Sequence, residues 1–131
     1  CFMNILDENI IENQCQLLVK WRVSFRQIGL NIGQDGMSDT DIITLLHQKR
    51  KLTFFTRDDD FFKKNLCHKN YCIVYLAIRK EEAAYFIRRF LNFQKMNTIV
   101  KRMGTVVKVS HSNITLWYLN HQKQKQYIWT K

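Results

Sequence analysis

The sequence contains no proline, no internal repeat and no linker-like change in composition, so nothing in it marks a boundary between domains. Its longest apolar run, residues 71–78, is far too short to cross a bilayer. Only four glycines are present, and three of them fall within residues 29–36, which we expect to form a mobile loop. These absences favour a single domain spanning residues 1–131, without a membrane span.

Acidic residues are scarce in the second part of the chain. Residues 61–131 contain two acids against fourteen Lys or Arg, whereas residues 1–60 contain nine acids against seven. The net charge of +10 favours a polyanionic partner such as nucleic acid, with an anionic membrane surface as the alternative. The residues that we expect to contact a nucleic-acid backbone are Arg57, Lys63, Lys64, Arg88, Arg89, Lys101 and Arg102. For Arg57, a salt bridge to a neighbouring acid is an equal alternative.

Four cysteines without an evident secretory signal indicate a reducing, cytoplasmic setting. Cys67, His68 and Cys72 resemble half of a zinc site, but no second pair matches them, so we expect no zinc. Cys15 and Cys72 fall in apolar patterns typical of a core. We expect Met3 to be the natural start of the chain, with residues 1 and 2 as added or upstream sequence.

Apolar patterns with the period of a strand alternate along the chain with patterns of helical period. Strands are expected at residues 3–6, 23–28, 52–55, 71–78, 105–109 and 114–118, and helices at 8–20, 39–48, 81–94 and 98–102. The last ten or so residues are polar and basic, and we expect a loosely ordered tail there. Within that tail, Trp129 is a candidate for base stacking or a partner interface, as is Trp117 before it. Such alternation predicts a three-layer α/β domain with a mainly parallel sheet.

Acidic residues follow the predicted strands at two places. Asp7 comes directly after the first strand, and Asp58, Asp59 and Asp60 come after the third. In parallel sheets, ligands bind beyond the carboxyl ends of the strands, where the strand order reverses. Asp39 could reach the same crevice if the glycine-rich loop before it folds over.

The neighbouring Asp41 has a different expected role. Ser38 is a suitable N-cap for the helix that follows, and Asp41 stands at the third helical position, where a capping-box acid belongs. Asp39, at the first helical position, is therefore freer to point into a site.

A resemblance to a known family rests on these same residues. Leu6-Asp7-Glu8-Asn9-Ile10, Gly36-Met37-Ser38-Asp39 leading into Asp41-Ile42-Ile43, Thr56-Arg57-Asp58-Asp59-Asp60-Phe61, and the strand from Cys72 to Leu76 resemble the short PIN-like family related to VapC-type toxin ribonucleases. The similarity covers most of the chain in order and spacing. It implies a three-layer α/β/α PIN-like fold that binds Mg2+ or Mn2+ and cleaves RNA.

Carried over from the family, the catalytic and metal-binding cluster is Asp7, Asp39, Asp58 and Asp60, with Asp59 at the variable position. Larger PIN domains commonly place a glutamate at the second acidic position, and this chain has only aspartates there. The chemistry agrees with the residue types, because carboxylates without a histidine pair suit Mg2+ or Mn2+ better than Zn2+. Clustered carboxylates also repel one another, so some pKa values should be raised.

The resemblance implies an RNA substrate, an antitoxin or other protein partner, and a homodimer as one form of assembly. Two alternatives stay open. One is a nucleic-acid-binding or protein-interaction module of PIN-like fold with a degenerate metal site. The other is a receiver-like or phosphatase-like domain, which also sets aspartates at strand ends. Small-phosphate chemistry does not call for a charge of +10, so this last alternative fits less well.

Overall fold

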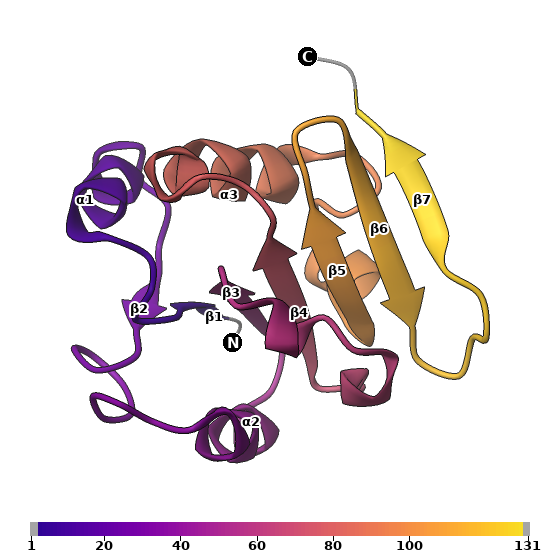
Figure 1. Ribbon diagram of the computed structural model, residues 1–131, viewed down its shortest axis with the longest axis horizontal. Helices are drawn as coiled ribbons and strands as arrows, with labels where there is room; N and C mark the ends of the chain where they lie inside the picture. Colours follow the sequence, from indigo (N-terminus) through magenta and orange to yellow (C-terminus); the bar gives the residue numbers. More distant parts are fainter. Residues whose placement is uncertain (1–2, 130–131) are drawn as a thin grey trace.

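A computed structural model describes residues 3–129 of the chain. The expectations about residues 1, 2, 130 and 131 lie outside this range. Within it the elements follow one another as a mixed α/β chain (Figure 1). The strands are β1 (Met3–Leu6), β2 (Arg26–Gln27), β3 (Leu52–Thr56), β4 (Tyr71–Leu76), β5 (Thr105–Val109), β6 (Asn113–Tyr118) and β7 (Lys125–Ile128). The helices are α1 (Glu12–Lys20), α2 (Asp39–His47), α3 (Ala83–Asn92) and α4 (Ile99–Arg102), with short 3-10 turns η1 (Asp59–Phe61), η2 (Lys64–Leu66) and η3 (Lys80–Glu82).

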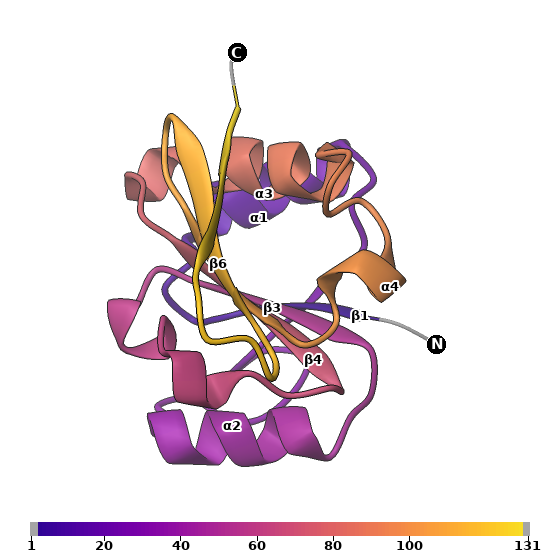
Figure 2. The same cartoon turned by 90° about the vertical axis from the view of Figure 1, so that its right-hand side faces the viewer.

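The seven strands form one sheet in the order β2-β1-β3-β4-β5-β6-β7. The pairs from β2 to β5 are parallel, and β6 and β7 are antiparallel additions. Figure 2 shows α1 and α3 over one face of the sheet and α2 under the other. The mostly parallel α/β architecture expected from the alternating pattern is therefore confirmed.

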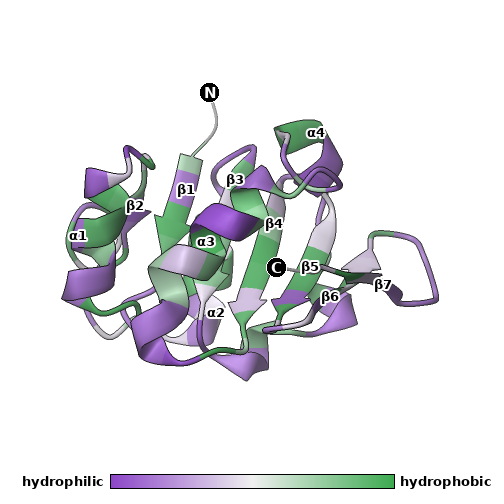
Figure 3. Cartoon of the chain, turned by 90° about the horizontal axis from the view of Figure 1, so that it is seen from above, coloured by the Kyte–Doolittle hydropathy of each residue, from purple (hydrophilic) through white to green (hydrophobic). Residues whose placement is uncertain are grey.

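Alternation along the strands divides the core into two parts. Leu6 of β1 and Phe55 of β3 are fully buried in the cluster that includes the α1 and α3 side chains. Their neighbours Ile5 and Phe54 point the other way, into the cluster that includes Ile42 of α2. Because both faces are covered, β3 and β4 are apolar almost throughout, as the hydropathy colouring in Figure 3 shows. Each strand therefore assigns its odd and even positions to opposite faces.

The first helix begins later than predicted, at Glu12 instead of residue 8. The intervening residues form a turn in which the N–H of Ile10 donates to the carbonyl of Asp7 at 3.2 Å. The second strand is also shorter than predicted. Only Arg26 and Gln27 pair with β1, while Val23 and Phe25 pack against the core from outside the ladder.

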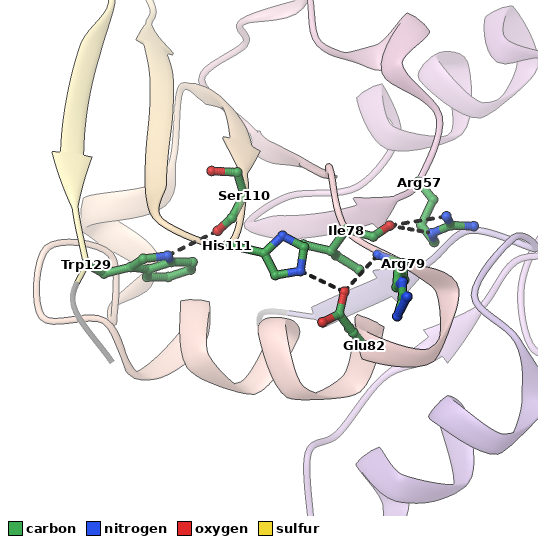
Figure 4. Close-up of polar contacts among 7 residues, drawn as sticks. All are labelled: Arg57, Ile78, Arg79, Glu82, Ser110, His111 and Trp129. Atoms are coloured by element: carbon green, nitrogen blue, oxygen red, sulfur yellow. Dashed lines mark hydrogen bonds and ion pairs between the residues drawn. The ribbon is translucent and has the colours of Figure 1, made fainter.

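The C-terminal segment is ordered, so the prediction of a loose tail is wrong for its described part. Lys125–Ile128 pairs antiparallel with β6. Trp129 is 6% exposed, and its indole N–H donates to the carbonyl of Ser110 at 3.1 Å (Figure 4). Trp129 therefore completes the core instead of offering a free ring to a base. Cys15 and Cys72 are buried as expected. Across residues 3–129, no helix has the length and apolar character needed to cross a membrane.

Candidate metal centre

The candidate site lies beyond the carboxyl ends of β1 and β3. These strands are parallel neighbours, with Leu6 opposite Phe55. From β1 the chain passes through α1 to β2 on one side, and it returns through α2, on the other face, to β3 on the opposite side of β1. The strand order therefore reverses between β1 and β3, which is where open α/β sheets bind ligands.

Asp58 and Asp60 are placed by the turn that follows β3. Asp58 is the N-cap of η1, and its Oδ1 accepts a hydrogen bond from the N–H of Asp60 at 2.9 Å. The N–H of Asp58 donates in turn to Oγ1 of Thr56 at 3.1 Å. The backbone is thus fixed on both sides of Asp58, while its second carboxylate oxygen stays available. Asp59, at the variable position of the family pattern, is exposed.

Asp39 reaches the same place because the glycine-rich loop folds toward β1, as the sequence allowed. The N–H of Gly36 donates to Oε1 of Glu8 at 2.9 Å, which holds the end of the loop near the end of β1. At Gly29, φ is +91°, a backbone conformation that residues with a side chain rarely adopt, so the turn favours glycine. Asp39 then starts α2 three residues after Gly36.

The N-cap of α2 is as expected, but the capping box is only half formed. Oγ of Ser38 accepts from the N–H of Asp41 at 3.1 Å. Within the described chain, the Asp41 carboxylate makes no return hydrogen bond to Ser38. Asp41 is exposed and stands outside the acid cluster.

Asp39, Asp58 and Asp60 each place one carboxylate oxygen within 4.8 Å of the other two. They come from α2 and from the turn after β3, and all three are at least partly exposed. Burial, followed by the negative charges of Asp58 and Asp60, raises the pKa of Asp39, and the nearby Lys63 opposes this shift. The raised pKa agrees with the repulsion expected among clustered carboxylates. Three such oxygens at this spacing can hold one hard divalent cation.

Asp7 is not a member of that group of three among residues 3–129. It is 7% exposed, and its carboxylate is engaged by the protein. Oδ1 accepts from the N–H of Glu8 at 2.7 Å, and Oδ2 accepts from the hydroxyl of Thr56 at 2.7 Å. Burial raises the pKa of Asp7, the two hydrogen bonds oppose that shift, and the charges of Glu8 and Asp58 add to it. Asp7 is thus buried and hydrogen-bonded, whereas the three carboxylates of the cluster are at least partly exposed.

Thr56 and Asn9, which the sequence did not predict as site residues, connect the parts of the site. Asn9 was expected at the start of a helix, but the helix begins at Glu12. Oγ1 of Thr56 links Asp7 to the backbone of Asp58. Asn9 donates from Nδ2 to Oγ1 of Thr56 at 3.2 Å and to Oδ2 of Asp7 at 3.4 Å, and its Oδ1 accepts from the N–H of Arg57 at 3.1 Å. Both residues lie inside the motifs that resemble the PIN-like family. Their position next to the acids in those motifs is the sequence feature that could have identified them as hydrogen-bonding residues of the site.

A groove of about 500 Å³ leads away from the acid cluster, between α2 and the turns η1 and η2. Asp39 and Asp60 stand on its wall together with Lys63, while Ile43 and Leu66 contribute apolar surface. Of the basic residues expected to contact nucleic acid, Lys63 is the one that lines this groove. Lys63 therefore brings a positive charge to the groove near Asp39.

Arg57 and Lys64 lie close to the site in sequence but point elsewhere. Nε and a terminal nitrogen of Arg57 donate to the carbonyl of Ile78 at 3.3 and 3.2 Å (Figure 4). In the part of the chain that the structure describes, Arg57 forms no ion pair with an acid. Lys64 places Nζ 5.4 Å from the centre of the Trp117 ring.

The remaining basic candidates lie away from the carboxylates. Arg88 stacks on Trp21, Arg89 lies over Trp129, and Nζ of Lys101 donates to the carbonyl of Gln94 at 2.7 Å. Arg102 was expected to contact a nucleic-acid backbone from the surface, but it is only 4% exposed. Its Nε donates to Oγ1 of Thr53 at 3.0 Å, which fixes its side chain inside the protein and not on an exposed surface.

Comparisons of the chain with protein-family models, with curated proteins and with solved structures found no match. The structural features that point to a function are therefore the positions of the carboxylates and their hydrogen bonds.

Proposed function

We propose that this chain is a Mg2+- or Mn2+-dependent endoribonuclease with a three-layer α/β/α PIN-like fold. The observation that carries the proposal is the approach of Asp39, Asp58 and Asp60 within 4.8 Å at the switch point of the sheet. The motif resemblance and the net charge of +10 support an RNA substrate.

Asp39, Asp58 and Asp60 would hold the cation. A bound divalent cation supplies an activated water near neutral pH and stabilises negative charge on the leaving oxygen of a phosphodiester. Asp58 is well suited to binding, because the N–H of Asp60 orients its Oδ1. Lys63, on the wall of the same groove, would pair with a phosphate next to the scissile one.

In the proposed nuclease, Asp7 is a positioning residue. Its carboxylate accepts from Thr56, and Thr56 accepts from the backbone of Asp58. A charge buried at Asp7 thus fixes the start of the turn that carries two candidate ligands. This role differs from the direct ligation that the family resemblance implies, and it rests on the separation of Asp7 from the group of three.

The partners follow from the same resemblance and charge. We propose RNA as the substrate, a cytoplasmic setting, and inhibition by an antitoxin-like protein, with a homodimer as the form of self-association. An acidic partner surface would complement the basic second half of the chain.

A second candidate function is RNA binding without cleavage, by a PIN-like module with a degenerate metal site. The observation that favours it is the engagement of Asp7 by Glu8 and Thr56, which leaves three exposed or half-exposed ligands for a cation. Such a module would keep the basic surface and lose the reaction.

The two candidates differ in an RNA cleavage assay. Mixed single-stranded RNAs are incubated with the protein in Mn2+, Mg2+ or EDTA, and the products are resolved by length. Metal-dependent cleavage that disappears in Asp58→Asn and persists in Asp41→Asn supports the nuclease. RNA binding without products in either metal supports the binding module. Cleavage that is unaffected by EDTA would overturn the metal-dependent mechanism.

A further inference from the structure

A second cavity lies at the opposite edge of the sheet from the acid cluster. It has a volume of about 390 Å³, and its wall includes Asn4, Trp21, Arg22, Ser24, Arg88 and Arg102. Asn4 is at the start of β1, opposite Thr53 of β3. Figures 2 and 3 both place α4, which ends at Arg102, at the edge where β1 begins.

The cavity and the acid cluster also belong to opposite faces. Asn4 is two residues before Leu6, whose side chain faces α1 and α3, and side chains two residues apart on a strand share a face. Arg88 comes from α3 itself. Asp39, in contrast, begins α2, which covers the other face. The two sites are therefore diagonally opposed across the sheet.

Arg102 is the unusual group in this cavity wall. Its side chain is buried, and burial lowers its pKa. The protein offers it only neutral acceptors, since Nε donates to Oγ1 of Thr53 and a terminal nitrogen donates to the carbonyl of Met96 at 2.9 Å. Buried guanidinium groups are normally paired with an anion, because removing the charge from water is costly. Arg102 has no such anion within the described chain.

Two further guanidinium-bearing residues share the wall. Arg88 lies 4.0 Å from the centre of the Trp21 ring, which limits its freedom, and Arg22 follows Trp21 directly. No Asp or Glu is among the described residues that line the cavity. Oδ1 of Asn4 is a buried acceptor without a hydrogen-bond partner in residues 3–129, so it adds no donor for an anion, and the positive charge of the wall comes from the arginines alone. Three arginines brought to one cavity without an acid leave the positive charge uncompensated by the protein.

We propose that this cavity binds a phosphate group of a ribonucleotide. Arginine pairs with phosphate through two parallel N–H···O hydrogen bonds, and a phosphate would neutralise the charge that the protein leaves unpaired. The occupant is distinct from the scissile phosphate, which the proposed nuclease would hold beyond the carboxyl ends of β1 and β3. The site does not depend on the acid cluster, so it stands whether or not the chain cleaves RNA.

The test measures binding by isothermal titration at low ionic strength in EDTA, so that metal at the acid cluster does not contribute. The ligands are inorganic phosphate, a 5′-phosphorylated mononucleotide, and a short RNA with or without a 5′ phosphate. Arg88→Gln and Arg22→Gln should each raise Kd by about tenfold to a hundredfold, the scale of a lost charge-assisted hydrogen bond. Arg50→Gln, an exposed change between α2 and β3 that removes the same charge, should leave Kd within about twofold.

The ligands separate the two sources of the phosphate. Equal affinity for the mononucleotide and the 5′-phosphorylated RNA, both above that of the unphosphorylated RNA, assigns the cavity to a terminal phosphate. Equal affinity for both RNAs, above that of the mononucleotide, assigns it to the backbone. Arg102 is not substituted because it is buried, and Arg22→Gln, at an exposed position, keeps the test valid if Arg88→Gln fails to fold. Equal Kd values for Arg22→Gln, Arg50→Gln and the wild type would overturn the proposal.

Discussion

The hydroxyl of Thr56 donates a 2.7 Å hydrogen bond to Oδ2 of Asp7, joining the carboxyl ends of two neighbouring parallel strands. The hydroxyl oxygen of Thr56 also accepts from the N–H of Asp58 at 3.1 Å, so the Thr56 side chain connects a buried acid to a candidate metal ligand. We expect the geometry of the site to depend on this connection as well as on the acids.

Thr56→Val tests the connection, because valine keeps the shape of threonine and removes the hydroxyl. We expect the free energy of unfolding to fall by about 1–3 kcal/mol, the cost of leaving a buried polar group without its donor. We also expect weaker Mn2+ binding, since the turn at Asp58 loses an anchor. Urea unfolding and calorimetric titration with Mn2+ measure the two effects.

Thr115→Val, in β6, is the matched control, because the side chain of Thr115 is half-exposed. It should change neither quantity appreciably. Equal Mn2+ affinity in Thr56→Val and the wild type would show that Asp58 is positioned without Thr56.

Asp39→Asn and Asp41→Asn separate ligation from helix capping within one helical turn. Asp39→Asn should abolish most of the rise in melting temperature produced by excess Mn2+, and cleavage should fall by about two orders of magnitude. Without metal, its stability should equal or exceed that of the wild type, because a repulsive charge is removed.

Asp41→Asn should keep the metal-dependent shift and lose about 0.3–1 kcal/mol of stability, through the helix dipole. Melting curves with and without Mn2+ provide the measurement for both variants. The opposite pattern, with Asp41→Asn insensitive to Mn2+ and Asp39→Asn responsive, would transfer the ligand role to Asp41.

Glu82 should make stability depend on acid pH. The N–H of Arg79 donates to its carboxylate at 3.0 Å, and this bond, with the contact to His111, holds the pKa of Glu82 below its usual range. A carboxyl group with a lowered folded-state pKa adds stability above its unfolded pKa and loses it as the pH falls through the folded value. Glu82→Gln should therefore be less stable than the wild type at pH 7, and the difference should vanish at strongly acid pH.

Chemical unfolding at pH 7 and over a series of acid pH values down to about pH 2.5 measures this difference. The difference should shrink as the pH falls below the unfolded pKa of a glutamate and vanish only below the lowered folded-state pKa. Glu81→Gln, at the exposed neighbouring position, provides the control and should not show the trend. A difference for Glu82→Gln that is independent of pH would contradict the account in which the ionised carboxylate of Glu82 stabilises the fold through these hydrogen bonds.

RNA binding should weaken steeply with salt, because cationic side chains displace counterions from the phosphate backbone. Fluorescence anisotropy at about 50 to 200 mM salt gives the slope of log K against the logarithm of the salt concentration. Over this range, a protein that contacts several phosphates loses much of its affinity. Lys63→Gln should reduce the magnitude of the slope by about 1, which corresponds to one lost phosphate contact. Lys123→Gln, between β6 and β7, should reduce it less, because Lys123 lies outside the groove. A salt-independent affinity would refute this account.

The sequence was sufficient for the alternation of strands and helices, because period and burial are local properties of each segment. It also identified Asp39, Asp58 and Asp60, which the fold brings together from separate elements. The sequence was not sufficient where contacts between distant residues determine the start of an element or the burial of a side chain. The turn before α1 receives hydrogen bonds from Nε2 of Gln27 to the carbonyls of Asp7 and Ile10, 20 and 17 residues away, and β7 has its strand partner in β6. Arg102 looks like a surface charge in the sequence, because its acceptor Thr53 lies 49 residues away.

The pairing of β1 with β3 has a consequence for folding. The hydrogen bond between Asp7 and Thr56 closes a loop of 49 residues, whereas β5, β6 and β7 are consecutive antiparallel neighbours in the chain. Closing long loops costs more chain entropy, and folds rich in distant contacts form more slowly. We therefore expect the C-terminal hairpins to gain protection from hydrogen exchange first. On this order of events, the acid cluster forms only in the last stage, so partly folded chains would carry the basic surface without a working metal centre.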